Sequence, residues 1–429
     1  MSLLERNLEN GSGRQLAGSP NSRRRSEAND ALAHVRIVEF GAYAAGPGIS
    51  KYLANFGARV VHVESQKRPD GFRLQYPPFK DGEVGINRSG CFAFFNDSKH
   101  GVTLDLKNRA GLELAYRLVE WSDIVIENMR PGVMSRLGLG YEDLNKRNPK
   151  LIMLSTSNMG QTGPHATHPG FGSQLSSLSG FTHLIGEPDG PPYFLYGPYI
   201  DFIAVAFGGI AVLAALDHRR RTDAGAYIDL SQYETGVQFI SSAVLDCTVN
   251  GVVANRNGNR DPLAVPHGCY PCKDNEWCVI SCWDEGEWER FCRASDKGWL
   301  SDSRFSDATR RKEHEKELNQ LIADWTCEQQ AEHLMWRLQS RRVHSAKVNA
   351  VRDLFRDPQL AFRNVWQQQR HEEMGDNTYR MTSYELSETP GAVRRAAPCL
   401  GADNEEVFQA WLGLSPAEYE NFSKEGAFS

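Results

Sequence analysis

Short apolar runs alternate with helical segments over the first third of the chain. Residues 35–40 and 58–64 are rich in Val and Ile, and a glycine-containing helical segment separates them. Similar runs follow at residues 101–106, 123–127 and 150–155. Two such runs joined by a helix form a βαβ unit, in which the strands are parallel and the crossover is right-handed. The alternation therefore predicts an α/β fold with an open, mostly parallel sheet that helices cover on both faces.

The composition limits the class of protein. The chain has 429 residues, of which 40% are hydrophobic, and its formal net charge is −6. This balance is typical of a globular protein and argues against nucleic-acid binding, which usually requires a basic domain. Nine cysteines, an odd number, fit a reducing compartment rather than a disulfide framework. We therefore predict a cytoplasmic protein that binds small molecules or other protein chains.

The longest apolar run, at residues 202–216, is too short for a membrane helix. Such a helix needs about 20 apolar residues, whereas this run lies between Asp201 and Asp217 and is interrupted by Gly208 and Gly209. The run is expected to be a buried helix with close backbone packing. We therefore predict no membrane among the partners of the protein.

Changes in composition divide the chain. Residues 1–34 are rich in Ser, Asn, Arg and Gly, and we expect them to be disordered. A large domain is predicted from residues 35–250, followed by an Asn/Gly/Arg-rich linker at 251–262. Residues 263–344 hold a strand pair and three charged amphipathic helices, which predicts a small α+β domain. Residues 345–429 are expected to return to the large domain.

Five possible metal ligands gather in the predicted small domain. They are His267, Cys269, Cys272, Cys278 and Cys282. A structural zinc site normally shows two well-spaced ligand pairs, whereas this segment is typical of two short strands around a turn, which would place the thiols on both faces. Small buried hydrophobic residues are the favoured interpretation, with zinc as the alternative.

The first βαβ unit raises the question of a dinucleotide site. Glu64 ends the second run, where a ribose-binding acid lies in nicotinamide enzymes. However, Gly41, Gly46 and Gly48 do not have the G-x-G-x-x-G spacing of such a site. NAD binding is therefore not favoured.

Cations and amides lie at the ends of the predicted strands. Open parallel sheets bind ligands beyond the carboxyl ends of their strands, and Arg and Lys bind phosphate through charge-assisted contacts. The residues concerned are Lys67, Arg68, Arg73, Asn96, Lys99, Asn128, Met129, Arg130 and Arg136. As a set they predict a pocket for a phosphorylated ligand, with a solvated rim of charge as the alternative.

A glycine- and serine-rich turn at residues 169–180 opens onto a predicted helix. Gly170 and Gly172 permit sharp turns, and a helix entered through glycine can bring N–H groups close to an anion. The turn lacks a carboxylate or imidazole for nucleophilic or acid/base chemistry. Local composition alone favours an ordinary surface loop.

Several motifs together point to one family. They are Gly46-Pro47, Val63-Glu64, Asn96-x-x-Lys99, Glu127-Asn128-x-Arg130-Pro131-Gly132, Gly138-Leu139-Gly140-Tyr141, Gly160-Gln161-Thr162-Gly163-Pro164 and Asp189-Gly190-Pro191-Pro192. From about residue 35 to its end the chain resembles the class III coenzyme A transferases, which include formyl-CoA transferase, carnitine CoA-transferase and the α-methylacyl-CoA racemases. The resemblance implies a large Rossmann-like domain and a small α+β domain, in a dimer whose two chains are interlocked rings. It also implies CoA esters as substrates and no permanently bound cofactor.

The resemblance further implies ten residues at CoA. Those expected around the nucleotide and pantetheine are Asn128, Met129, Arg130 and Arg136. Those of the Asn-x-x-Lys motif are Asn96 and Lys99. Those whose backbone is expected against the ligand are Tyr43 and Ala44, and those expected near the 3′-phosphate are Lys67 and Arg68.

One position departs from the family pattern. The family has Pro-Gly-Tyr-Asp where this chain has Pro-Gly-Phe-Gly, so Gly172 stands at the position of the Asp that attacks the acyl-CoA thioester. Glycine cannot be a nucleophile, so the resemblance implies no catalytic residue in this chain. It predicts the non-nucleophilic subunit of a heteromeric enzyme, an interlocked heterodimer or heterotetramer with an Asp-bearing paralogue. Succinyl-CoA is the expected donor, and an acid such as the benzylsuccinate of anaerobic aromatic degradation is the expected acceptor.

Two alternatives stay open. The chain could be a CoA-binding or regulatory protein that performs no chemistry. It could also be an active homodimeric transferase that uses another carboxylate, for which Glu187 and Asp189 are the candidates in the following loop.

Overall fold

A six-stranded parallel sheet forms the centre of the large domain in the computed structural model, which describes residues 30–429. The strand order is β3-β2-β1-β4-β5-β6. The strands are β1 (Arg36–Phe40), β2 (Arg59–Glu64), β3 (His100–Thr103), β4 (Ile124–Glu127), β5 (Ile152–Ser157) and β6 (Ala226–Ser231). The predicted α/β fold with a parallel sheet is therefore confirmed.

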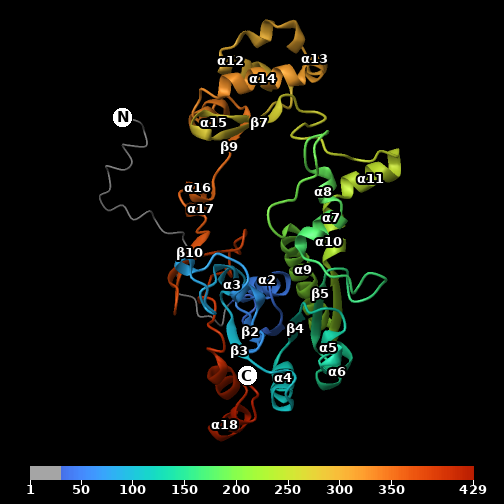
Figure 1. The fold of residues 1–429 in the computed structure, drawn as a ribbon, viewed down its shortest axis with the longest axis vertical. Helices are drawn as coiled ribbons and strands as arrows, with labels where there is room; N and C mark the ends of the chain where they lie inside the picture. Colours follow the sequence, from blue (N-terminus) through green and yellow to red (C-terminus); the bar gives the residue numbers. More distant parts are fainter. Residues whose placement is uncertain (1–29) are drawn as a thin grey trace, which may run out of the picture.

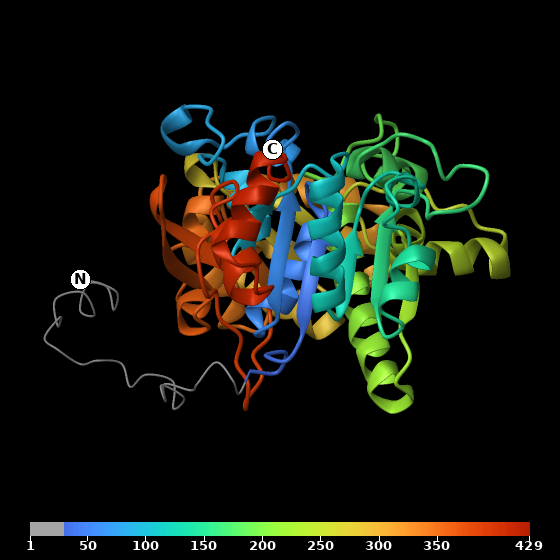
Figure 2. The same cartoon turned by 90° about the horizontal axis from the view of Figure 1, so that it is seen from below.

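Helices cover both faces of this sheet, because its strands are apolar on both sides. Ile37 and Val38 are consecutive residues of β1, yet they belong to different cores, since successive strand side chains point to opposite faces. On one face lie α2 (Ala45–Asn55) and α9 (Tyr199–Thr222). On the other lie α4 (Arg109–Trp121), the π-helix η7 (Glu406–Trp411) and α18 (Pro416–Lys424). Figure 2 shows α4 and the C-terminal helices in front of the sheet.

Two glycines bring α2 and α9 into close contact. A Cβ atom at Gly48 would lie 2.5 Å from Val205, and one at Gly208 would overlap Ile49. By length and composition α9 could cross a membrane. One side of α9 is buried as expected, since Val205 and Val212 lie in the core between α9 and the sheet, but the other side is not, since Ile210 and Leu213 are exposed.

The other helices of the large domain lie mainly beyond the carboxyl ends of the strands and around α9. They are α3 (Gly90–Asn96), α5 (Val133–Arg136), α6 (Tyr141–Arg147), α7 (Gly172–Leu178), α8 (Phe181–Leu184), α10 (Gln232–Phe239) and α11 (Ser241–Asn250), with the short 3-10 helices η2 (Gly71–Arg73) and η3 (Lys80–Gly82).

The small domain has a three-stranded antiparallel sheet rather than the predicted strand pair. Its strands are β7 (His267–Pro271), β8 (Trp277–Ser281) and β9 (His344–Lys347). It carries four α-helices rather than three, namely α12 (Glu285–Ser295), α13 (Ala308–Glu313), α14 (Glu315–Thr326) and α15 (Ala331–Gln339). The expectation missed β9 because this short strand gains its order from pairing with β8, which lies far away in the sequence.

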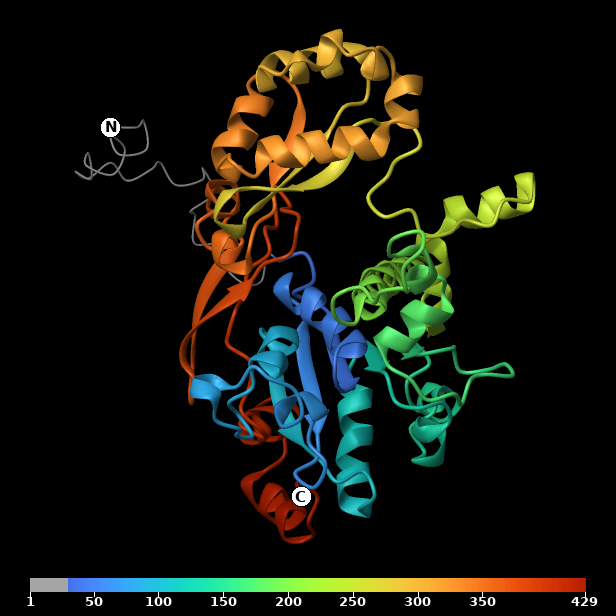
Figure 3. The ribbon, with the colours of Figure 1, turned by 45° about the horizontal axis from the view of Figure 1, so that its top comes forward.

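Two separate segments connect the domains. Figures 1 and 3 show the segment after α11 and the segment after β9 running on opposite sides between the large and small domains. Beyond the second segment, α16 (Val351–Leu354) and α17 (Pro358–Phe362) precede the hairpin of β10 (Trp366–His371) and β11 (Gly375–Arg380). The chain therefore leaves the large domain and returns to it, as the order of its elements predicts.

The N-terminal segment is bound to the large domain from residue 30 onward, although we expected disorder up to residue 34. Leu32 N donates a 3.0 Å hydrogen bond to Phe56 O, and Arg394 forms a 2.7 Å ion pair with Asp30. The rest of this expectation, for residues 1–29, lies outside the described residues.

The free edge of β3 is occupied by side chains from the C-terminal part of the chain. Gly101 N donates a 2.7 Å hydrogen bond to Asp403 Oδ2, and Thr103 N donates a 2.9 Å bond to Asn404 Oδ1. These two side chains take the place of a seventh strand, so the amides of the edge are satisfied.

Large apolar side chains are exposed on α9 and on α11. No residue of α11 is buried. The large exposed side chains of this surface are Phe202, Ile210, Leu213, Val244, Leu245 and Val249. We call this the α9–α11 surface.

Candidate functional site

The loop between β1 and α2 is held in place from two sides. Asn128, which follows β4, accepts a 2.9 Å hydrogen bond from Ala42 N and donates a 2.8 Å bond to Ala42 O. The next residue, Tyr43, has a left-handed backbone with φ 64°, which is costly for a residue other than glycine. Asp70 stabilises this conformation, since its carboxylate accepts hydrogen bonds from Tyr43 N at 3.0 and 3.1 Å. The loop is therefore preformed.

A buried charge network lies beneath this loop. Lys99 donates 2.8 Å bonds to Glu39 Oε2, to Pro47 O and to Asn96 Oδ1, and neither Lys99 nor Glu39 is exposed. His62 Nδ1 lies 2.9 Å from Glu39 Oε1. Burial alone would raise the pKa of Glu39, but the charges and hydrogen bonds of Lys99 and His62 hold it at about 2. The carboxylate of Glu39 therefore stays ionised inside the fold.

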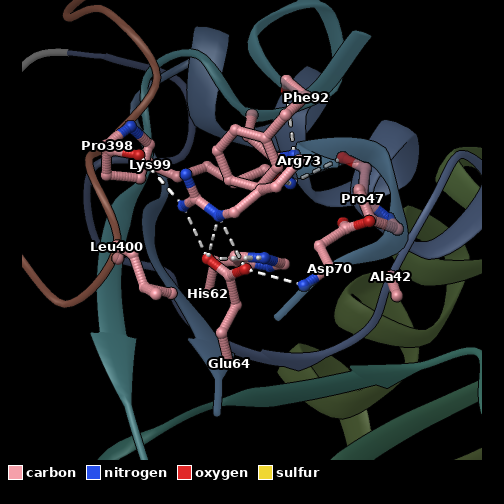
Figure 4. Close-up of polar contacts among 12 residues, drawn as sticks. Ala42, Pro47, His62, Glu64, Asp70, Arg73, Phe92, Lys99, Pro398 and Leu400 are labelled. Atoms are coloured by element: carbon pink, nitrogen blue, oxygen red, sulfur yellow. Dashed lines mark hydrogen bonds and ion pairs between the residues drawn. The ribbon is translucent and has the colours of Figure 1, made fainter. Parts of the chain in front are cut away.

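The network continues from His62 to the segment that carries Asp70. Arg73 Nη2 donates a 2.7 Å bond to Glu64 Oε2, and its guanidinium carbon lies 3.5 Å from the ring centre of Phe92. Figure 4 shows Arg73 between Glu64 and Phe92. Glu64 also accepts a 3.0 Å bond from Asp70 N. Burial raises the pKa of Asp70 to about 6. Buried pairs thus fix Asp70, and Asp70 in turn fixes Tyr43.

Aromatic rings connect the β1–α2 loop with the glycine-rich turn. Tyr43 packs edge-to-face on Phe72, with ring centres 5.3 Å apart, and on Phe171, at 5.9 Å. Phe72 stacks on Phe95 at 5.5 Å, and Phe95 stacks on Phe202 of α9 at 5.8 Å. The rings form an apolar wall beside Gly172, which follows Phe171 directly.

Asp201 lies at Gly172. A Cβ atom added to Gly172 would lie 2.8 Å from Asp201 Oδ2 and 2.7 Å from Pro198 Cβ. The residue Asp201 is partly exposed but its carboxylate is largely covered, and among residues 30–429 that carboxylate has no hydrogen bond or ion pair. Burial raises the pKa of Asp201 to about 7. A carboxyl group therefore occupies the space beside the position where a side chain is missing.

Sequence reasoning missed Asp201 and considered other carboxylates. Glu187 is exposed and lies against the first connecting segment, where a Cβ atom at Gly258 would be 2.7 Å from Glu187 Oε2. Asp189 is exposed in the turn that follows. The only sequence signal for Asp201 is an acid in the first turn of a long apolar helix.

The predicted CoA residues fall into two groups. Asn96 and Lys99 are buried, and all three N–H donors of Lys99 are used within the protein. Their geometry gives them a supporting position under α2 rather than a place on the surface. Ala44 is also buried, and the exposed or partly exposed residues are Tyr43, Lys67, Arg68, Asn128, Met129, Arg130 and Arg136.

The exposed cations lie on both sides of the β1–α2 loop. β1 lies between β2 and β4 in the sheet, so residues after β2 and β4 flank the loop. Lys67 forms a 2.7 Å ion pair with Asp105. The guanidinium groups of Arg68, Arg130 and Arg136 have no hydrogen bond or ion pair in the described part of the chain. These three groups are free to bind anionic oxygens.

Three of the four cysteines in the predicted ligand group pack in the apolar core of the small domain, and the fourth, Cys269, is partly exposed. Cys272, Cys278 and Cys282 are buried beside Trp288 and Phe291. Burial raises the pKa of the Cys278 thiol to about 12, which opposes the thiolate form that metals bind. This packing supports the favoured interpretation of small buried hydrophobic residues.

One group of possible metal ligands within residues 30–429 consists of His100, Asp403 and Glu406. Both oxygens of Asp403 already accept hydrogen bonds, from Gly101 N at 2.7 Å and from Arg395 at 2.9 Å. This arrangement is that of a structural bridge at the edge of β3.

The sequence was compared with protein-family models and with known proteins. The family model of CoA-transferase family III matches residues 32–404. Succinyl-CoA--D-citramalate CoA-transferase of Chloroflexus aurantiacus is 33% identical over 389 residues, which cover 90% of this chain and 94% of that protein. The alpha subunit of succinyl-CoA--L-malate CoA-transferase of Chloroflexus aurantiacus is 31% identical, covering 90% of both chains, and the beta subunit is 31% identical, covering 89% of this chain and 94% of its own.

A solved structure has the same fold. A CAIB/BAIF family protein from Brucella suis superimposes with a TM-score of 0.83 at 28% identity, and the match covers 90% of this chain and 100% of that chain. The chain therefore belongs to CoA-transferase family III.

Proposed function

We propose that this protein transfers CoA from succinyl-CoA to a dicarboxylic acid. The observation that carries the proposal is the family scaffold with its preformed β1–α2 loop, in which Asn128 bonds both polar atoms of Ala42. The relatives named above use succinyl-CoA, with D-citramalate or L-malate as the second acid. CoA esters are substrates in this proposal, and no permanently bound cofactor is required.

The exposed arginines are suited to the phosphates of CoA. Arg68 on one side of the β1–α2 loop and Arg130 and Arg136 on the other would bind phosphate oxygens. The backbone at Tyr43 and Ala44 would face the pantetheine arm, and Lys67 would lie near the 3′-phosphate. Lys99 and Asn96 would support the loop from beneath without touching the ligand.

We also propose an interlocked dimer. The α9–α11 surface exposes large apolar side chains over two helices, which a monomer would leave in water. Because the chain leaves and re-enters the large domain, two copies or two paralogues could thread through each other. The predicted cytoplasmic location belongs to the same proposal.

In its narrower form, the proposal makes this chain the non-nucleophilic subunit of a heteromer. Gly172 offers no nucleophile, and a related L-malate enzyme consists of an alpha and a beta subunit. An Asp-bearing paralogue would then supply the reactive carboxylate, with benzylsuccinate as one candidate acceptor. A second candidate, favoured by the position of Asp201, is a chain that performs the transfer with its own carboxylate.

The test is CoA transfer from succinyl-CoA to a panel of dicarboxylic acids. The chain is assayed alone and after co-expression with an Asp-bearing paralogue. Transfer only in the pair supports the heteromer, and transfer by the chain alone supports the second candidate. If CoA binds with the chain alone in calorimetry but neither preparation transfers it, the chain is a CoA-binding protein and the proposed function is wrong.

A further inference from the structure

We propose that Asp201 is the catalytic carboxylate of this chain, placed by α9 in the space that Gly172 leaves empty. The inference rests on the proposed CoA transfer and identifies the group that performs it. It differs from the heteromer proposal in one respect: the nucleophile belongs to this chain and not to the paralogue.

The space at Gly172 carries the argument. The family nucleophile would be the side chain of residue 172, whose first atom would lie 2.8 Å from Asp201 Oδ2. The carboxylate of Asp201 therefore borders the space that such a side chain would enter. Glycine is required for this arrangement, because any Cβ atom at residue 172 would collide with Asp201 and with Pro198. The missing side chain and the nearby carboxylate are thus two parts of one arrangement.

The surroundings of Asp201 suit a reactive group better than a structural one. Two buried glutamates of this region are ion-paired, Glu39 with Lys99 and Glu64 with Arg73. Among residues 30–429 no donor side chain or amide binds the Asp201 carboxylate, although it lies beside the aromatic wall. An acid in the first turn of a helix is favoured by the helix dipole. That explanation accounts for the residue type, but not for its unpaired position against Gly172.

The surface around Asp201 is partly open. The residue as a whole is partly exposed although its carboxylate is largely covered, and the neighbouring rings of Phe171 and Phe202 are 58% and 38% exposed. A thioester carbonyl could therefore approach the carboxylate from the side of the aromatic wall.

The chemistry balances without an oxidant or a metal. An oxygen of Asp201 attacks the thioester carbonyl of succinyl-CoA, the C–S bond breaks, and CoA leaves as the thiolate, which gives a mixed anhydride. The thiolate then attacks the Asp201 carbonyl carbon and releases succinate, which leaves an aspartyl-CoA thioester. The acceptor carboxylate attacks this thioester and forms a second anhydride. The thiolate attacks its acyl carbon, which releases the new CoA ester and restores Asp201.

Trapping the intermediate tests the proposal. The purified full chain, alone and co-expressed with the Asp-bearing paralogue, is incubated with succinyl-CoA and hydroxylamine, which converts an aspartyl anhydride or thioester into a hydroxamate. Peptide mass spectrometry locates the hydroxamate. We expect it on Asp201, with transfer reduced about 1,000-fold or more in Asp201→Asn. Asp217→Asn is the matched control, because it changes the same residue type in the same helix at an exposed position.

The outcomes separate this inference from the proposed function. Transfer with the hydroxamate on another residue, or with Asp201→Asn fully active, overturns the role of Asp201 and leaves CoA transfer established. A hydroxamate found only on the paralogue also overturns the role of Asp201, and it favours the heteromer. If no preparation transfers CoA or yields a hydroxamate, although calorimetry shows that CoA binds, both the inference and the proposed function are wrong. A circular dichroism spectrum and melting curve of Asp201→Asn like those of the parent chain show that its loss of transfer is not unfolding.

Discussion

Lys99 donates a 2.8 Å hydrogen bond to Glu39 in the interior of the large domain, where neither side chain is exposed. The family resemblance places Lys99 at CoA, but in this chain its remaining two donors bind Pro47 and Asn96. The pair therefore supports the first turn of α2 and the loop before it. We therefore expect its effect on the ligand to be indirect.

Removing this lysine should cost stability rather than affinity. Lys99→Met leaves a buried carboxylate without its partner, which typically costs about 3–5 kcal/mol of the free energy of unfolding. Lys146→Met is the control, since Lys146 is exposed, lies outside the predicted CoA residues, and its ion pair with Asp143 is expected to contribute about 0–1 kcal/mol. Denaturant unfolding measures the free energy of unfolding, and calorimetry on the folded variants measures their affinity for CoA. Weaker CoA binding by folded Lys99→Met, with no loss of stability, would contradict the supporting role.

Formation of the covalent intermediate should depend on pH around neutrality. Burial raises the pKa of Asp201 to about 7, and only the ionised carboxylate is a nucleophile. The rate of hydroxamate formation should therefore be low well below pH 7, rise through it and level off above it. Single-turnover measurements with succinyl-CoA test this. A rate that does not change through pH 7, or one that falls, would exclude Asp201 as the attacking group.

An added methyl group at residue 172 should disable the site without touching the substrate. In Gly172→Ala the new Cβ would lie 2.7 to 2.8 Å from Pro198 and Asp201, so the carboxylate must move. Overpacking of this kind costs about 1–3 kcal/mol, and we expect a loss of transfer of roughly tenfold or more, by analogy with other small displacements of reacting groups. Gly298→Ala is the control, because nothing lies within 4 Å of its added Cβ. Unchanged transfer in Gly172→Ala would show that the position of Asp201 is not critical.

Two buried glutamates should give the stability of the fold opposite dependences on pH. The pKa of Glu39 is held at about 2, below its ordinary value of 4.5. The stabilisation that this carboxylate contributes to the free energy of unfolding is therefore present above pH 4.5 and is lost as the pH falls toward 2. Burial raises the pKa of Glu127 to about 7. The stabilisation that protonated Glu127 contributes to the free energy of unfolding is therefore present below pH 4.5 and is lost as the pH rises through 7.

Glu127→Gln isolates the second effect. Between pH 5 and pH 8, the free energy of unfolding of the parent chain should fall relative to that of Glu127→Gln by on the order of 3 kcal/mol. Denaturant titrations at the two pH values supply the comparison. Parallel changes in the two proteins would mean that Glu127 titrates at an ordinary pKa in the fold.

The parallel sheet could be predicted because apolar runs and helices alternate with a clear period, as in residues 35–64. The strand β9 could not, since its order depends on pairing with β8. For the site, the empty position at Gly172 was visible in the sequence, but Asp201 was not. The two residues meet because α7 packs on α9 with a particular rotation of each helix, and neither rotation is encoded in local spacing. The burial of Lys99 could not be predicted for a similar reason, since its three partners come from separate elements.

The side chains at the edge of β3 also bear on how the protein behaves when it is damaged. An uncovered edge strand presents a row of free amides to any strand of a neighbouring molecule. Asp403 and Asn404 close that row by accepting hydrogen bonds from Gly101 and Thr103. A cut or substitution that releases this short turn would leave most of the core intact and yet open a template for intermolecular β-pairing. The first sign of such damage would then be aggregation at unchanged secondary structure, before any loss of the fold.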